Sequence, residues 1–309
     1  MFVCTLYSVL CTPVSAQQSL VSVGVRGGGQ MWLLKAADVS ASLRPSIGGN
    51  GLLDVRYAYY GHISTTFDLG LTAGVGIGYG ALGIQGTDSS AFVNTDYLDN
   101  HIEYTAKAAF RQMESFVRMD VSLMLAMRAE GFVVNVGPRF MMPFAVQKTL
   151  LVSDATIAAY YPLYNVTVVN ELITGKLETP YQSQMTNDQH PTTLLLGLEM
   201  GYEWTLGRNH ILGVQGYADI GLWSPAVAAS NMAAHLLSVS SIEKDANTGE
   251  GVPAQVTVNG IDGLVASRRM IDFGLRVYYT FPIGKSRLSA DGHTRDTRKH
   301  HNRYLKNSK

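Results

Sequence analysis

The stretch that decides the fold reads MIDFGLRVYYTF and runs from Met270 to Phe281. Apolar or aromatic side chains occupy every second position, and an acid and a base, Asp272 and Arg276, fall between them. Because successive side chains of a strand point to opposite faces, the stretch predicts a strand with one apolar and one charged face. In a soluble sheet the apolar face would contact a core, whereas in a membrane barrel it would contact lipid while the charges point inward.

The composition favours the membrane alternative. The chain has 309 residues, of which 46% are hydrophobic and only 16% are charged, and it contains 31 glycines at a formal net charge of zero. This charge content is low for a soluble protein. An uninterrupted apolar run of about 18 residues, which a helical membrane span would need, does not occur in the sequence.

Seven further stretches repeat the two-residue alternation. They lie at 21–32, 53–60, 67–80, 117–125, 132–144, 194–204 and 212–223. The connections after the first, third, fifth and seventh predicted strands are long, and those after the second, fourth and sixth are short. A soluble sandwich has no reason to sort its loops in this way, whereas an outer-membrane barrel has short periplasmic turns and long outer loops. An even strand number also places both termini in the periplasm.

With these features the chain resembles the eight-stranded outer-membrane barrels typified by the transmembrane domain of outer-membrane protein A, without a recognisable peptidoglycan-binding domain. The resemblance covers residues 20–284 and implies an all-β fold, an eight-stranded antiparallel transmembrane β-barrel built as an up-and-down meander with long outer loops. Tyr279 and Phe281 match the aromatic positions of the insertion signal of such barrels, although residues 282–309 follow here. Outer-membrane lipid and the barrel-insertion machinery are the implied partners.

The N-terminal segment predicts export. Residues 1–16 are mostly apolar and end in small residues that suit signal-peptidase cleavage before Gln17. The segment lacks a basic start, which leaves open a translation start further upstream or an ordinary first strand. Because Cys4 and Cys11 both lie here, the mature chain excludes disulfides, thiol nucleophiles and cysteine metal sites.

After the barrel, expected at 17–284, residues 285–309 carry eight Lys or Arg against two Asp. Such a run predicts a solvated, disordered periplasmic tail. The alternative is a tether to an anionic periplasmic partner, such as cell-wall polymer, anionic lipid or an acidic envelope protein. Nucleic acid is not expected in that compartment, and the chain is expected to be a monomer unless it belongs to a larger envelope complex.

The polar faces of the predicted strands carry twelve ionisable side chains. These are Arg26, Asp54, Arg56, Asp68, Arg118, Asp120, Arg139, Glu199, Glu203, Asp219, Asp272 and Arg276. An eight-stranded barrel is only wide enough for its own side chains, and an unpaired buried charge costs several kcal/mol. We therefore predict a structural ion-pair network that plugs the lumen. A gated narrow pore or a proton-linked path for small solutes is the alternative.

Histidines are the candidates for catalysis, because imidazole titrates near neutral pH. His62 and Ser64 resemble part of a lipid A deacylase site, but the expected topology places them in a periplasmic turn. Two further pairs fall in expected outer loops: His101 with Asp99, and His190 with Asp188. The chain lacks the spacings of metal, phosphate-cradling and nucleotide sites, so we expect no catalytic residue, metal or cofactor.

The sequence thus predicts an outer-membrane barrel with a structural, adhesive or partner-binding role carried by its extracellular loops. A narrow porin-like channel is the second interpretation, and a lipid-modifying enzyme is the third. Residues 151–178 are rich in Tyr and Val. They are expected to extend the barrel as a hairpin or to fold over its mouth.

Overall fold

The computed structural model describes residues 17–37, 41–64, 66–188, 192–206, 210–223 and 235–283. The predicted signal peptide at 1–16 and the basic tail at 285–309 both lie outside these ranges. Within them, helical structure is nowhere long and apolar enough to cross a membrane.

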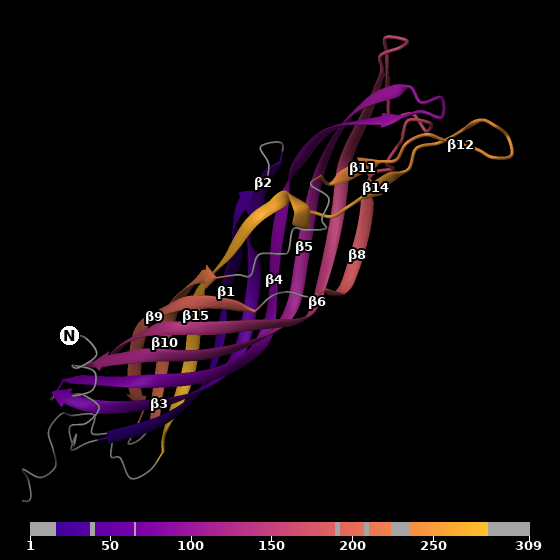
Figure 1. Ribbon diagram of the computed structural model, residues 1–309. Coiled ribbons are helices and arrows are strands. Elements are labelled where there is room, and N and C mark those ends of the chain that lie inside the picture. The colour runs from indigo at the N-terminus through magenta and orange to yellow at the C-terminus, as the bar shows by residue number, and fades with distance from the viewer. Residues whose placement is uncertain are drawn as a thin grey trace, which may run out of the picture.

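Eight antiparallel strands close into a barrel (Figure 1). They are β1 (Gln17–Ala36), β3 (Gly48–Ser64), β4 (Phe67–Thr95), β5 (His101–Ala129), β6 (Phe132–Tyr161), β9 (Thr193–Leu206), β10 (His210–Trp223) and β15 (Val265–Ile283). Each strand pairs with the next one along the chain, and β15 closes the ring against β1, with Phe281 opposite Val21 and Met270 opposite Trp32. The predicted eight-stranded antiparallel meander is confirmed.

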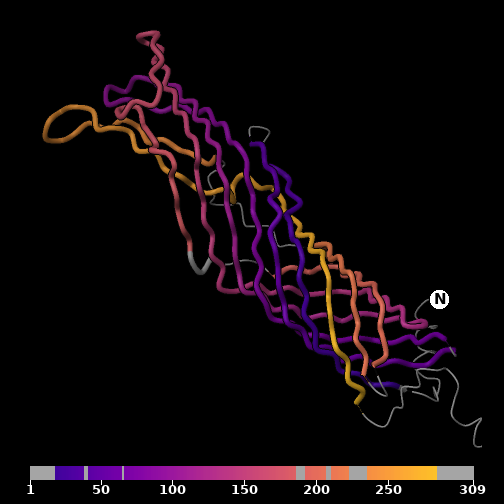
Figure 2. The backbone as a smooth tube through the Cα atoms, turned by 180° about the vertical axis from the view of Figure 1, so that it is seen from behind, coloured from indigo at the N-terminus to yellow at the C-terminus, as the bar shows by residue number. Residues whose placement is uncertain are grey.

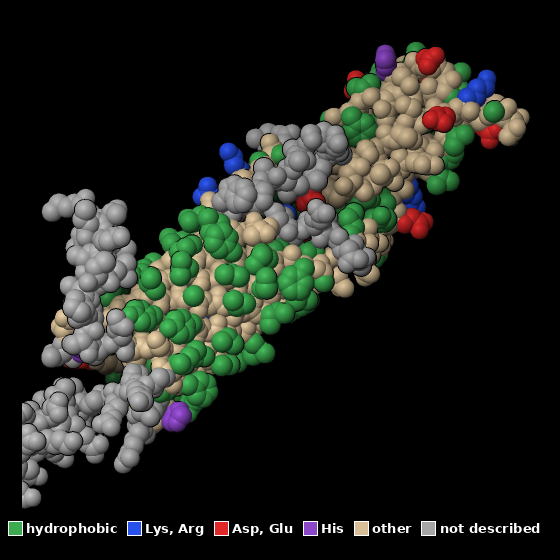
Figure 3. All heavy atoms as spheres, turned by 60° about the horizontal axis from the view of Figure 1, so that its bottom comes forward, with side chains coloured by type: hydrophobic (Ala, Val, Ile, Leu, Met, Phe, Trp, Pro, Cys, Tyr) green, Lys and Arg blue, Asp and Glu red, His purple; other side chains and the backbone are tan. Residues whose placement is uncertain are grey.

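The outer face of the barrel is apolar and its interior is charged. Val25, Leu53 and Val75 point outward and are 53–61% exposed, whereas Arg26, which follows Val25 directly, is 2% exposed. Hydrophobic side chains cover the barrel wall in Figure 3. Because lipid rather than water solvates such a surface favourably, this distribution is the one expected of a transmembrane β-barrel.

Three strands continue beyond the barrel as a sheet of their own, which we call the extension (Figure 2). β4, β5 and β6 contain 29, 29 and 30 residues, whereas about 9–11 residues cross a bilayer. β2 (Ser42–Ser46) pairs with β4, while β8 (Tyr181–Asp188) and β7 (Val166–Val169) pair with β6. We call the opposite end of the barrel, where the short β3–β4, β5–β6 and β9–β10 connections lie, the turn end.

The sequence predicted a long loop after the third strand, and this prediction was wrong. Residues 81–95 and 101–116 continue β4 and β5, and only residues 96–100 turn the chain. The long stretch after the fifth predicted strand likewise begins as a continuation of β6 up to Tyr161. Of the two alternatives for residues 151–178, the structure shows the hairpin that extends the barrel, formed by β6 and β7.

The connection between β10 and β15 covers one face of the extension. It contains β11 (Leu237–Val239), β12 (Glu243–Lys244), β13 (Gly251–Val252), β14 (Val256–Val258) and the short 3-10 helix η2 (Asp262–Leu264). Leu236, Leu237 and Leu264 are at most 2% exposed and join one hydrophobic core with Ile102 and Ile157 of the sheet. The extension is therefore a folded two-layer body rather than a set of independent loops.

Candidate functional site: a charged lumen between two apolar layers

The structure places eleven of the twelve ionisable side chains expected to face inward in the lumen, each at most 9% exposed. Asp68 is the exception. It lies at the turn end with its side chain 20% exposed, and its Oδ1 contacts Nδ1 of His62. Asp68 is the second residue of β4 and pairs with His62 close to the β3–β4 turn, so water reaches it.

Ten of the lumen charges form one chain of alternating sign. Its order is Arg276, Asp54, Arg56, Glu199, Arg139, Asp219, Arg26, Asp120, Arg118 and Asp272. The N to O distances include 2.8 Å for Arg276 to Asp54, 2.6 Å for Arg26 to Asp219 and 2.9 Å for Arg118 to Asp272. Five arginines thus face five carboxylates, and their formal charges cancel inside the barrel.

Neutral polar groups bond to both ends of this chain. Asn50 donates to Oδ1 of Asp272 over 2.6 Å, and the Tyr217 hydroxyl donates to Asn50 over 3.0 Å. At the other end Arg276 donates to Ser22 over 3.2 Å and to Gln215 over 3.4 Å. Such bonds offset the cost of removing charges from water.

Glycines make room for the large lumen side chains. A Cβ on Gly74 of β4 would lie 2.7 Å from Cγ of Arg56 and 2.9 Å from the Ser122 hydroxyl. Gly213 of β10 faces the ring of Tyr278 in the same way. The glycine-rich face of the sequence stretch 67–80 therefore corresponds to a wall against which arginines pack.

One lumen pair was missed by the sequence analysis. Arg128 of β5 forms an ion pair with Glu203 of β9 at 2.6 Å, and its guanidinium lies over the ring of Tyr60 at 4.6 Å. The Tyr278 hydroxyl donates to Glu203 over 2.7 Å. Arg118, Asp120 and Arg128 all occupy even-numbered positions of β5, so they point to the same face of the strand. Extending the alternation from residue 125 to the turn would therefore have predicted that Arg128 faces the lumen.

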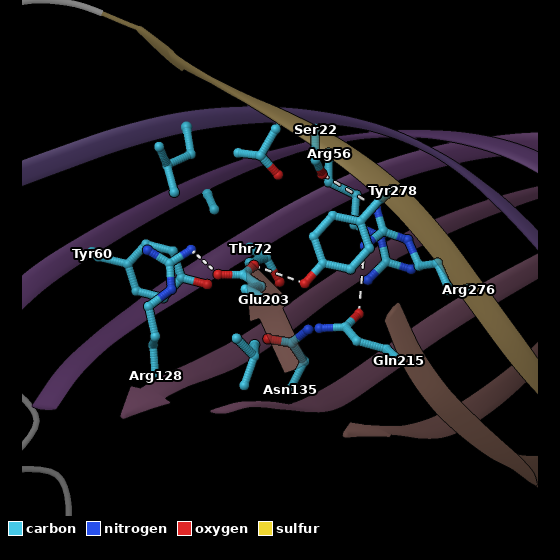
Figure 4. A pocket seen from close by; sticks show the side chains of 14 residues that line it. Ser22, Arg56, Tyr60, Thr72, Arg128, Asn135, Glu203, Gln215, Arg276 and Tyr278 are labelled. Atoms are coloured by element: carbon cyan, nitrogen blue, oxygen red, sulfur yellow. Dashed lines mark hydrogen bonds and ion pairs between the residues drawn. The ribbon is translucent and has the colours of Figure 1, made fainter. Parts of the chain in front are cut away.

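A small cavity lies beside this pair (Figure 4). It measures about 30 Å³, and its lining includes Arg128 of β5, Glu203 of β9, and Arg276 and Tyr278 of β15. This volume holds water but no larger solute. A second cavity beside Arg26 and Arg139 measures about 10 Å³.

Apolar layers lie on both sides of the lumen charges. At the end nearer the extension lie five large side chains with 0% exposure: Trp32, Phe116, Met141, Leu195 and Met270. Near the turn end Leu20, Tyr60, Ala126 and Ile211 form a second apolar cluster, 0–4% exposed. The ion pairs are therefore enclosed in a compartment that the barrel's own side chains fill.

The two histidine candidates that the structure describes, His62 and His101, lie outside this compartment. His62 is exposed at the turn end, where Ser64 is exposed as well, and His101 is exposed at the far end of the extension beside the turn that contains Asp99. His190 lies outside the described residues, and so does the side chain of Asp188. Among the residues that the structure describes, groups of His, Cys, Asp and Glu able to hold a metal ion are absent.

The aromatic end of the last strand faces outward. The rings of Tyr279 and Phe281 lie 4.8 Å apart, and that of His210 stacks on Tyr279 at 5.5 Å. The placement suits a membrane interface, where aromatic side chains form girdles on such barrels. A role for this pair in insertion stays a prediction.

Comparisons with known proteins give likenesses of shape only. Neither a protein-family model nor a curated protein matches the chain. The attachment invasion locus protein Ail of Yersinia pestis, solved in complex with the heparin analogue sucrose octasulfate, is 7% identical over 85% of this chain and 99% of that chain, with a TM-score of 0.27. The outer-membrane protease OmpT of Escherichia coli is 9% identical over 88% of this chain and 98% of that chain, with a TM-score of 0.25. The translocator domain of the autotransporter NalP of Neisseria meningitidis is 9% identical over 91% of this chain and 94% of that chain, with a TM-score of 0.20. Such TM-scores carry no argument about activity.

Proposed function

We propose that the protein is an outer-membrane β-barrel with a closed lumen, whose extension presents a recognition surface outside the cell. The observation that carries the proposal is the continuation of β4, β5 and β6 over 29–30 residues into a folded body with its own core. A barrel that served only as a pore or an anchor would need no such body. Binding surfaces commonly lie where a rigid scaffold holds them away from its base.

The far end of the extension offers an apolar contact surface, which we call the tip. It consists of the β4–β5 turn and the β6–β7 hairpin with the residues after it. Its exposed apolar side chains include Leu98 at 60%, Leu163 at 66%, Tyr164 at 62% and Leu172 at 71%. The two turns are neighbours, because Glu103 of β5 pairs with Tyr160 of β6. Exposed apolar groups gathered at one end of a folded body favour protein or membrane contact.

Substituting the tip tests this role. In intact cells that display the full chain, replacing both Leu163 and Tyr164 by serine is expected to reduce adhesion to immobilised matrix proteins and to other cells by about tenfold or more, as for an interface hot spot. Met185→Ser on β8, where the methionine is 48% exposed but lies away from the tip, is the matched control and should stay within about twofold. Equal adhesion of all three proteins would refute a binding role of the tip.

The closed lumen leads to a second expectation. In planar bilayers the purified protein should give no stable unitary current at any voltage, because an apolar layer lies on each side of the charges. Arg118→Ala should be silent as well, since removal of one charge leaves Trp32 and Met270 in place. Recovery of folded protein from the bilayers, shown by heat-modifiable gel mobility, controls for insertion. Unitary currents that change with Arg118→Ala would instead establish the narrow channel.

A further inference from the structure

A groove of about 510 Å³ crosses the outer face of the extension, on the side away from its core. Its floor is a row of side chains on neighbouring strands, in which Arg44 of β2 pairs with Gln85 of β4, and Gln85 pairs with Arg111 of β5. Hydroxyls of Ser42, Thr87 and Ser153 line the same groove. It thus presents two guanidinium groups, an amide and three hydroxyls to one ligand.

A β-bulge on β6 shapes one wall. Ala109 of β5 pairs with Asp154, but the next residue, Phe110, pairs with Val152, so Ser153 is the extra residue. Its hydroxyl donates to the Ala109 carbonyl over 3.4 Å. Bulges interrupt the regular pairing and re-aim side chains, which makes a depression in an otherwise flat sheet.

The positive charges of Arg44 and Arg111 are not neutralised by acidic side chains among the described residues. Arg44 and Arg111 are exposed, and neither side chain has a hydrogen bond or an ion pair among the described residues. Asp154 of β6 stands opposite Ala109 and does not line the groove. Guanidinium groups bind phosphate and carboxylate through paired, charge-assisted hydrogen bonds, so the groove suits an anionic ligand with several hydroxyls.

The direction in which the groove faces limits the source of that ligand. Gln85 has the same parity on β4 as Val75, Ile77 and Tyr79, which are 53–55% exposed on the outer wall of the barrel. The groove therefore opens sideways over the surrounding leaflet. Gln85 stands six residues beyond Tyr79, which at about 3.3 Å per residue and a tilt of about 40° places the groove roughly 15 Å above the apolar wall.

At this height a simple phospholipid headgroup does not reach, because headgroup regions add only about 5–8 Å to each side of the hydrocarbon core. A lipid with a projecting saccharide does. We propose that the groove binds the phosphate- or carboxylate-bearing saccharide of a glycolipid in the outer leaflet beside the barrel. Arg44 and Arg111 take the anionic groups, and Gln85 with the hydroxyls takes the sugar. This inference rests on the outer-membrane location proposed above.

The test uses the folded full-length protein in detergent, with the delipidated, phosphorylated core oligosaccharide of outer-membrane lipopolysaccharide as the probe. Binding is measured by isothermal titration, and competition arms use inorganic phosphate, nanodiscs that contain the intact glycolipid, and nanodiscs of phosphatidylglycerol. Replacing both Arg44 and Arg111 by glutamine is expected to weaken binding at least about tenfold, since charge-assisted bonds are lost. Lys107→Gln, also an exposed cation on the outer face of β5, should change it by less than about twofold.

The outcomes separate as follows. Competition by the intact glycolipid but not by phosphatidylglycerol, and loss in the arginine variant alone, supports the proposal. Equal competition by inorganic phosphate or phosphatidylglycerol overturns it in favour of a site for any anion, and equal binding by the arginine and lysine variants overturns it as well. Heat-modifiable mobility of each variant shows that the barrel is folded. Protease access to the extension in intact cells tests the location separately, so failure of the proposed function is distinguishable from failure of the groove.

Discussion

Replacing Glu199 by alanine is expected to destabilise the barrel by about 3–5 kcal/mol, which is the usual cost of removing one partner of a buried ion pair. Glu199 is 0% exposed, and both of its oxygens are engaged, by Arg56 and by Arg139 at 2.6 Å. The substitution leaves two guanidinium groups facing a gap inside the lumen. The midpoint of urea unfolding, followed by heat-modifiable gel mobility, measures the effect.

Asp68→Asn is the matched control. This carboxylate was also expected to face inward, but it lies at the turn end against His62, whose side chain is 47% exposed. An exposed pair contributes about 0–1 kcal/mol, so the midpoint should barely move. If Glu199→Ala unfolds no earlier than Asp68→Asn, the lumen chain of ion pairs does not stabilise the barrel.

Replacing Leu237 by alanine is expected to cost the extension about 2–5 kcal/mol, the range for a buried leucine. Leu237 is 2% exposed and lies on β11, within the segment that covers the extension core. Because the barrel has its own pairing and interior, its heat-modifiable mobility should remain, while the extension opens more often. Limited proteolysis of folded protein should therefore cleave the extension faster, by about thirtyfold or more, since 1.4 kcal/mol corresponds to tenfold.

Val252→Ala serves as the comparison, because Val252 lies on β13 of the same segment but is 38% exposed. Its proteolysis rate should stay near that of the unaltered protein. If Leu237→Ala abolished the gel shift of the barrel together with protection of the extension, the two parts would form a single cooperative unit, contrary to this expectation.

The alternation of apolar and polar residues predicted the barrel but not the extension, and the reason is physical. Along β4 the large apolar side chains occupy outward positions up to Tyr79, whereas beyond it they occupy the inward ones, as at Leu82 and Ile84. β5 shows the same inversion, with Phe110 inward in the extension and Leu123 outward in the barrel. The strand is continuous, but its surroundings change from lipid to water, so the buried face changes sides. A prediction that expects apolar residues at the same alternate positions throughout therefore places the end of the strand where the apolar residues switch to the other positions.

The sequence predicted which charged side chains face the lumen, but it did not predict which of them form ion pairs with one another. Parity alone shows that Arg26 and Arg276 point inward, because that follows from local strand geometry. Their partners depend on register and curvature: Arg26 stands directly opposite Arg276 in the β1–β15 pair, yet each bonds to a carboxylate on another strand. Asp219 and Arg26 are 193 residues apart in the chain. A local sequence pattern cannot predict a contact between residues so far apart in the chain.

β5 and β6 each run as one continuous strand from the lumen to the tip, although two bulges interrupt their pairing, and this continuity has a mechanical consequence. Hydrogen bonds between antiparallel strands lie perpendicular to the strand direction. When a partner bound at the tip is pulled away, the force acts along the strands. It therefore loads the hydrogen bonds between β5 and β6 in shear, and many bonds share the load at once. These bonds extend from the pair of Tyr160 with Glu103 to the pair of Phe132 with Ala129. The load passes along continuous strands into the wall of the barrel, through the bulge at which Ser115 pairs with Gln147 and Val117 pairs with Phe144.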